Sequence, residues 1–279
     1  MKRSWILAIV PFLAVSAIAA AQGVPWQFRW QQGQVLTYRV EHQTAVTEVA
    51  NGNKSDTRTR LNLTKRWKVL AVDPAGVATL QLSLDSMRME MTKPNGDTLL
   101  FDSADPEKSS PALREGLGRF VGQPLAVLCL DQRGKVVAVK ESKHGPASRY
   151  ESELPCVVTL PEANAQTGLQ WERGYKITIE PPQGTGEKYE GVQTYLCKSL
   201  GEGTATLTLS TSFKTMPESL LDRVPLLQMQ PEGEVVFDTV NGRLRSASLR
   251  IEKELLGHQG EGSSYKFQSS YTEKIVEGQ

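Results

Sequence analysis

Histidine and cysteine are scarce in this chain, which has only three of each among its 279 residues. The histidines are His42, His144 and His258, and they form no His-x-His or HExxH motif. Paired CxxC motifs and a GxSxG nucleophile elbow are also absent. A closed zinc site needs four such ligands at close spacing, so the sequence predicts no metal and no cofactor. Catalytic triads are recognised by geometry, so the absence of these motifs does not exclude a hydrolase. We rank this function third among the possible functions.

An excess of charge of one sign is also missing. The formal net charge is +1, from 32 basic and 31 acidic residues, and removal of Lys2 and Arg3 would leave 30 against 31, or −1. A near-neutral chain creates no broad field that would attract nucleic acid or an anionic membrane. We therefore predict no nucleic-acid partner.

Long apolar runs are missing beyond the first residues. The chain begins with Lys2 and Arg3, continues with an apolar stretch over residues 5–18, and reaches small residues at 19–21. This order is typical of a secretory signal peptide, and the apolar stretch is shorter than the about 20 residues that span a bilayer. We expect residues 1–21 to be a signal peptide cleaved before Gln22. The mature protein is then expected to be periplasmic or extracellular, of bacterial origin, and without a transmembrane segment.

Alternation of apolar and polar residues dominates the mature sequence. From Ala205 to Phe213 the odd positions are mostly apolar and the even positions are Thr or Ser. The same period of two occurs in residues 36–41, 60–69 and 265–275. Such a period indicates β-strands with one buried face.

Turn sequences separate these runs. They include Asn-Gly pairs at 51–52, 95–96 and 241–242, which favour tight hairpins. Only residues 111–121 and 217–229 show helical spacing. We therefore predict a mainly β fold of curved antiparallel meander sheets, an open barrel or half-barrel, with one short helix in each half.

A change of phase occurs in one strand. Leucines occupy the even positions of residues 80–84, whereas Met87, Met89 and Met91 occupy odd positions. A β-bulge at residues 85–86 would bring both sets to one face and bend the sheet. The methionines have two interpretations, core packing or the pliable wall of an apolar ligand-binding cavity.

The two halves of the chain resemble each other. Gly76–Ser83 and Gly203–Ser210 are identical at six of eight positions. We predict a duplication, with an N-terminal β half at 26–140, a connector at 141–165 and a C-terminal β half at 166–277. The sequence leaves open whether these halves are two domains or one. It also leaves open a disulfide, for which the cysteines are Cys129, Cys156 and Cys197.

Short motifs, mainly between residues 28 and 140, carry a family resemblance. They are Phe28-x-Trp30-x-x-Gly33-x-x-x-x-Tyr38, Trp67-Lys68-Val69, Gly76-x-Ala78-Thr79, Arg88-Met89, Phe101-Asp102-Ser103, Val121-Gly122-Gln123-Pro124 and Asp131-x-x-Gly134-x-Val136. With them the chain resembles an uncharacterised family of secreted bacterial proteins, a domain of unknown function. That family implies compartment and fold but no activity. In architecture alone the chain is similar to periplasmic lipoprotein carriers, in which an incomplete β-barrel and a helical lid hold acyl chains.

These patterns favour a non-catalytic binding module for an apolar or lipid-like ligand. The alternative is a structural or protein-interaction component of the cell envelope. A hydrolase would require one histidine to meet a serine, cysteine or acid in a cleft. We expect His42 on a buried face, in phase with Leu36, Tyr38 and Val40, and His144 and His258 in solvated loops. A basic strand face is expected to be solvated, and its residues are Arg58, Arg60, Arg66 and Lys68.

Overall fold

The computed structural model describes residues 26–145, 147, 150, 158–179, 181 and 184–277. Twelve strands form one sheet in the order β6-β5-β3-β2-β1-β12-β11-β10-β9-β8-β7, with β4 paired to the distal part of β3. The strands are β1 (Val35–Ala50), β2 (Asn53–Val72), β3 (Ala78–Thr92), β4 (Thr98–Asp102), β5 (Pro124–Leu130), β6 (Val136–Ser142), β7 (Gln170–Ile179), β8 (Glu187–Gly201), β9 (Thr204–Phe213), β10 (Glu232–Asp238), β11 (Arg243–Leu256) and β12 (Ser264–Ile275). The prediction of a mainly β, antiparallel meander fold is confirmed. The expected signal peptide, residues 1–21, lies outside the described residues.

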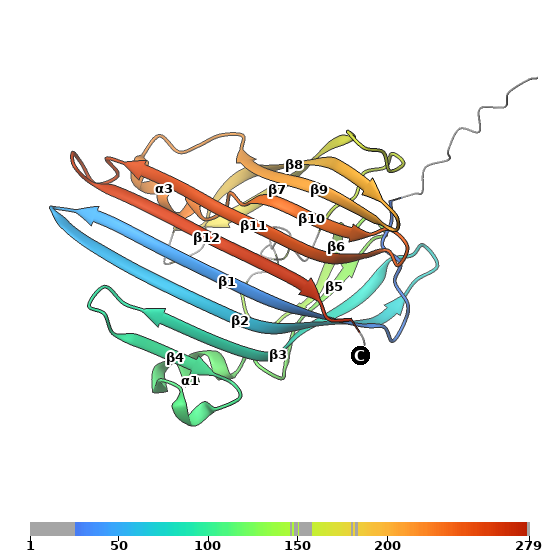
Figure 1. The fold of residues 1–279 in the computed structure, drawn as a ribbon, viewed down its shortest axis with the longest axis horizontal. Helices are drawn as coiled ribbons and strands as arrows, with labels where there is room; N and C mark the ends of the chain where they lie inside the picture. Colours follow the sequence, from blue (N-terminus) through green and yellow to red (C-terminus); the bar gives the residue numbers. More distant parts are fainter. Residues whose placement is uncertain are drawn as a thin grey trace, which may run out of the picture.

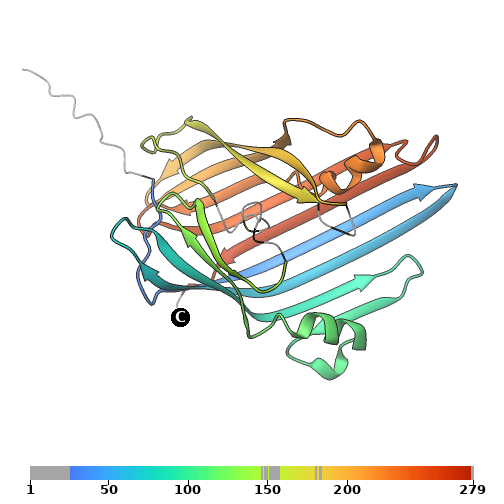
Figure 2. The same cartoon turned by 180° about the vertical axis from the view of Figure 1, so that it is seen from behind.

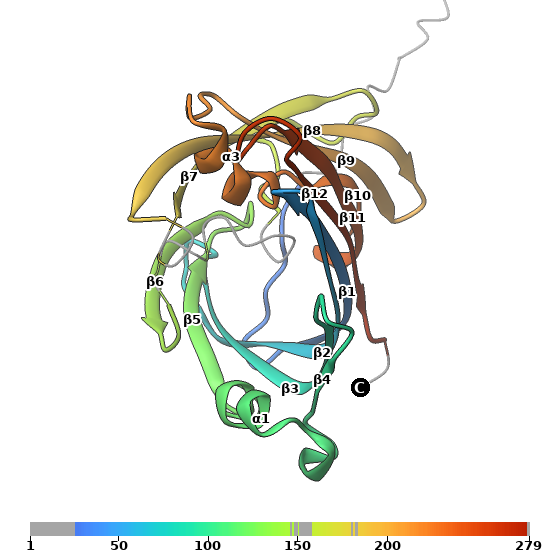
Figure 3. The same ribbon diagram turned by 90° about the vertical axis from the view of Figure 1, so that its left-hand side faces the viewer.

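The sheet curls around its buried face without closing. In Figure 1 the long central strands run side by side, and in Figure 3 the sheet bends round so that β6 and β7 approach from opposite sides. Within the described residues, β6 and β7 are the edges of the sheet and do not pair with each other. We call the buried side of the sheet the inner face; it carries Leu36, Tyr38 and Val40, each 4% exposed. The opposite, solvated side is the outer face.

The two halves follow a similar order of elements. Strands β1, β2 and β3 and the short strand β4 are followed by helix α1 (Pro111–Gly118) and then by β5 and β6. Strands β7, β8 and β9 are followed by helix α3 (Leu220–Leu227) and then by β10 and β11. A duplicated unit would produce this repetition, and the duplication itself stays a prediction.

Strand β12 joins the halves because it pairs with β11 on one side and with β1 on the other. The principal core is likewise shared. It includes Trp67 and Leu128 from the first half and Leu207 and Phe237 from the second. In the described residues the two halves therefore contribute to one sheet and one core.

The bulge expected in β3 is present. The register between β2 and β3 shifts between Thr64, opposite Ser86, and Lys65, opposite Leu84, which leaves Asp85 as the extra residue. Leu84 and Met87 are then both buried, with 7% and 9% of their surface exposed. The bulge thus keeps the leucines and the first methionine on the inner face.

The hairpin between β1 and β2 illustrates the turn chemistry. Asn51 has a φ of 52° and Gly52 a φ of 75°, so both residues of the two-residue loop lie in the left-handed region. A type I′ turn needs this conformation at both positions, and Asn-Gly supplies it at the lowest steric cost. The turn fixes the register of the two longest strands.

Both helices are shorter than the sequence pattern suggested. Helix α1 ends at Gly118 and α3 spans only Leu220–Leu227, with Pro225 inside it and the side chain of Ser219 accepting a hydrogen bond from the Asp222 amide. A short 3-10 turn, η1 (Pro106–Lys108), precedes α1. Figure 2 shows α3 lying over the inner side of the sheet, where it contacts β11. Within the described residues no helix is long and apolar enough to span a membrane.

Candidate ligand pocket

A pocket of 170 Å³ opens on the inner face beside the C-terminal end of α3. It is lined by His42, Tyr175, Ile177, Gln228, Met229, Pro231, Leu249, Arg250, Ile251, Ser269 and Tyr271. These residues come from four strands and from the segment that follows α3. The pocket is therefore a product of tertiary folding and not of any local motif.

Sheet register places the base of the pocket. His42 of β1 lies opposite Tyr271 of β12, which in turn lies opposite Leu249 of β11. One pleat away, Ser269 lies opposite Ile251. Since residues two apart share a face, these side chains form two adjacent rows on the inner face.

The base contains one polar pair. His42 Nε2 and Ser269 Oγ are 2.9 Å apart, within hydrogen-bonding distance. The ring of Tyr271 meets the imidazole edge-on, with centroids 5.6 Å apart. Burial lowers the pKa of His42 below its usual 6.5, so the neutral imidazole is favoured at neutral pH.

The walls are apolar and buried. Tyr175 and Ile177 of β7 pack with Leu226 of α3, which is fully buried. Gly191 on the neighbouring strand β8 makes room for Tyr175, because a Cβ there would lie 2.6 Å from its Cζ. Burial raises the pKa of Tyr175 to about 12, so its phenol is neutral at physiological pH. The wall formed by Tyr175, Ile177 and Leu226 thus carries no charge, and the charged residue of the pocket lining is Arg250.

A buried charge pair lies next to the pocket. The hydroxyl of Tyr271 donates to Glu273 Oε2 at 3.0 Å, and Lys65 Nζ lies 2.6 Å from Glu273 Oε1. The side chains of Lys65 and Glu273 are 8% and 1% exposed. Each charge is therefore compensated by the other inside the core.

Ser269, Lys65 and Glu273 were not among the predicted site residues, although the sequence carries a signal for them. Lys65 is in phase with the buried Trp67 and Val69, and Ser269 and Glu273 are in phase with the buried Phe267. A polar residue at an apolar position of an alternating strand marks a buried polar site. His42 does lie on the inner face, as predicted.

The methionine stripe, which consists of Met87, Met89 and Met91, lies outside this pocket. Met87 and Met89 pack in a separate cluster with Phe101 and with Leu113 and Leu117 of α1. Met91 lies opposite Leu99 of β4. The pocket beside α3 is lined by Met229, and none of the three stripe methionines belongs to its lining.

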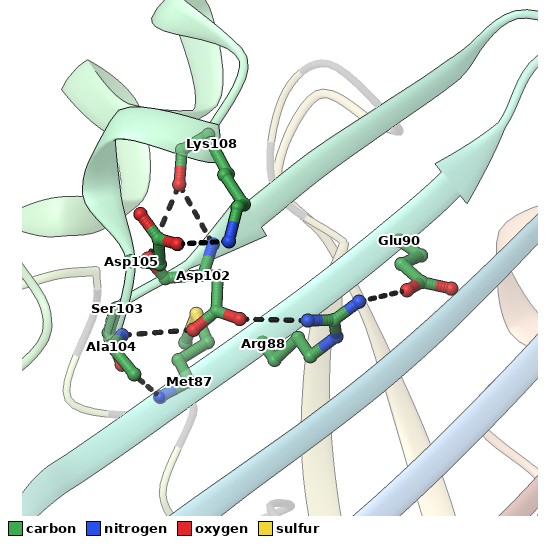
Figure 4. Close-up of polar contacts among 9 residues, drawn as sticks. Met87, Arg88, Glu90, Asp102, Ser103, Ala104, Asp105 and Lys108 are labelled. Atoms are coloured by element: carbon green, nitrogen blue, oxygen red, sulfur yellow. Dashed lines mark hydrogen bonds and ion pairs between the residues drawn. The ribbon is translucent and has the colours of Figure 1, made fainter.

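Polar contacts on the outer face hold β4 against β3 beside Met87. Figure 4 shows Arg88 reaching Asp102 and Glu90, with N–O distances of 2.8 and 2.6 Å. The backbone amide of Met87 donates to Ser103 Oγ at 2.9 Å. These contacts position β4 so that Phe101 fills the space over Met87. Met87 and Met89 therefore contribute to packing in the described structure, and a role of the three methionines in ligand binding stays a prediction.

The prediction that His258 is solvated is wrong. Its side chain is 1% exposed, and its Nε2 lies 3.1 Å from Glu48 Oε1. The loop between β11 and β12 folds back against β1, which buries the ring although the loop is rich in glycine. His144 contacts the ring of Phe120, with centroids 4.4 Å apart.

The His42–Ser269 pair lacks the other parts of a hydrolase site. In the described residues, no carboxylate forms a hydrogen bond or ion pair with His42. Ser269 lies within a central strand, opposite Thr44 on one side and Ile251 on the other, so nearby backbone amides belong to the sheet ladders. Donors for an oxyanion hole therefore do not converge on Ser269.

Metal and disulfide chemistry can be assessed for the described part of the chain. It contains no group of three or more His, Cys, Asp or Glu side chains that could hold a metal ion. Cys129 and Cys197 are buried free thiols. Cys156, the remaining candidate for a disulfide, lies outside the described residues.

The basic strand face of β2 is solvated, as predicted. Arg58, Arg60, Arg66 and Lys68 are all exposed on the outer face. Arg66 is paired with Asp85, the bulged residue of β3. Arg58 and Arg60 line a hollow of 540 Å³, whose lining also includes the acidic residues Glu90 and Glu252.

Comparisons with known proteins identify no family. No protein-family model and no curated protein match the chain. Among solved structures, DynF from the dynemicin biosynthesis pathway of Micromonospora chersina has a TM-score of 0.23 and 9% identity, over 92% of this chain and 86% of that one. The Salmonella secretin InvG gives a TM-score of 0.17 at 11% identity, over 86% of this chain and 57% of the secretin chain. The Pseudomonas aeruginosa MucA/MucB complex gives a TM-score of 0.14 at 10% identity, over 86% of this chain and 89% of the matched chain. Scores this low carry no argument, and the family resemblance stays a prediction.

Proposed function

We propose that this chain is an exported, non-catalytic binding protein that holds the apolar part of a small ligand in the pocket beside α3. The observation that carries the proposal is a pocket with apolar walls and one polar pair at its base. Ligand sites in proteins commonly combine mostly apolar walls with a few placed polar groups. The pocket meets that description on the inner face of an open sheet.

The volume of the pocket limits the size of the ligand segment that it can enclose. Its volume of 170 Å³ is below the about 300–1,000 Å³ typical of sites for drug-sized molecules. A slender segment, such as an acyl chain, fits this space better than a bulky ring system. Only part of such a ligand would be enclosed, and the remainder would extend along the inner face.

A second candidate is an interaction protein of the cell envelope. Its support is the exposed edge strand β6, where Val137 is 50% exposed and one side of the strand is unpaired among the described residues. An edge strand can accept a strand from a partner. We rank this function second because β6 is short and ends in charged residues.

Filling the pocket tests the first proposal. In the mature chain, Ile251→Trp should lower the affinity for a polarity-sensitive apolar dye or a lauryl-chain ligand at least tenfold. Glu252→Trp is the matched control, because the neighbouring residue points to the outer face and is exposed. It should bind like the wild type. Equal binding by both variants, or no binding by the wild type, would refute the proposal.

A further inference from the structure

Resting on the proposed function, we propose that the pocket selects a single-chain amphiphile with an uncharged hydrogen-bonding head, such as a hydroxyl, held by His42 and Ser269. The tail would then lie between Ile177, Ile251 and Met229. The apolar walls alone do not define the head group of the ligand, whereas His42 and Ser269 do.

The pair of His42 and Ser269 has unused hydrogen-bonding capacity. His42 Nε2 and Ser269 Oγ already satisfy one bond between them at 2.9 Å. A serine hydroxyl has one donor and two acceptor positions, so Ser269 retains capacity for a ligand. A hydroxyl head, which both donates and accepts, can satisfy that capacity in either orientation of the pair.

The charged side chains around the pocket are already paired. Arg250 is the cation of its lining, but its side chain is 76% exposed and pairs with Glu232 at 3.1 Å. Lys65 is 2.6 Å from Glu273 and compensates that carboxylate. A ligand carboxylate at the base would therefore be buried without a free cation, which is costly.

The groups that face His42 are Ser269 and Tyr271 of β12, Leu61 of β2 and, across the pocket, Tyr175 of β7. Burial raises the pKa of Tyr175 to about 12, so its phenol is neutral at physiological pH. None of these side chains carries a negative charge that would stabilise an imidazolium. The base is thus suited to a neutral head.

Three ligands of equal chain length test the head group: dodecanol, laurate and dodecane. Displacement of an apolar dye should show dodecanol binding about tenfold more tightly than either of the others, which corresponds to about 1.4 kcal/mol. In Ser269→Ala the advantage of dodecanol over dodecane should disappear. Ser270→Ala, on the outer face of the same strand, is the control and should bind like the wild type.

The pH dependence gives an independent readout. Acidification charges His42, and the charged ring is disfavoured beside an apolar ligand, so dodecanol affinity should be constant above about pH 6.5 and should fall as the pH decreases below it. His42→Gln should remove this dependence. Tighter binding of laurate, or equal binding of all three ligands, would overturn the head-group inference and leave the proposed function standing. Absence of binding by all three would overturn both.

Discussion

At the residue scale, polar side chains on the inner face distinguish this sheet from an ordinary apolar core. Lys65, Ser269 and Glu273 each occupy a position that alternation assigns to the buried side. Alternation predicted the apolar members of these rows, and it correctly placed His42. It could not predict the pairing, because Lys65 and Glu273 lie on strands that meet only through β1, where Tyr38 lies opposite Lys65 and Val40 opposite Glu273.

The buried ion pair leads to a prediction about stability. Glu273→Gln leaves the Lys65 charge uncompensated in the core, so the free energy of unfolding should fall by about 3–5 kcal/mol. The double variant Lys65→Met/Glu273→Leu should be more stable than Glu273→Gln, because no lone charge remains. Urea unfolding followed by tryptophan fluorescence measures both. A double variant no more stable than Glu273→Gln would contradict this account.

The lowered pKa of His42 predicts how stability depends on pH. Below the unfolded pKa of 6.5 the unfolded state binds a proton that the folded state resists, so the free energy of unfolding should decrease as pH falls. The decrease should run from about 6.5 down to the lower folded pKa. If the wild type is more stable than His42→Gln at neutral pH, the free energies of unfolding of the two proteins should converge as the pH falls through this window. A difference independent of pH would show that His42 titrates normally.

At the element scale, α3 closes one side of the pocket, and β12 joins the two halves. Residues 217–229 predicted a helix, and a helix is present, but its position over β7 and β11 depends on long-range packing that local spacing does not encode. The bulge at Asp85 was predictable because the phase change is written in consecutive residues. The pairing of the first strand with the last was not predictable, since it requires contacts between the ends of the chain.

Helix α3 should depend strongly on Leu226, the more deeply buried of its two buried leucines. Leu226 is fully buried against Tyr175 and Ile177, so Leu226→Ala should cost about 2–5 kcal/mol of unfolding free energy and weaken ligand binding. Leu221 on the same helix is 55% exposed, and Leu221→Ala should change stability by less than about 0.5 kcal/mol. Thermal and urea unfolding of the two variants provide the comparison. Equal losses of stability in Leu226→Ala and Leu221→Ala would contradict this packing of α3.

At the scale of the whole molecule, one curled sheet offers two separate apolar regions. The first half uses its helix, with Phe101 and Leu113, to fill the space over Met87 and Met89. The second half leaves a pocket beside α3. The sequence drew attention to the methionines because three occur in one strand, whereas the pocket residues are scattered over β1, β7, β11 and β12.

Methyl NMR of the mature chain, with and without dodecanol, tests the central claim most directly. The pocket beside α3 predicts that signals of Ile177, Met229 and Ile251 shift on titration, while Met87, Met89 and Val137 remain unchanged. Shifts confined to the methionine stripe or to strand β6, with none at Ile251, would contradict it.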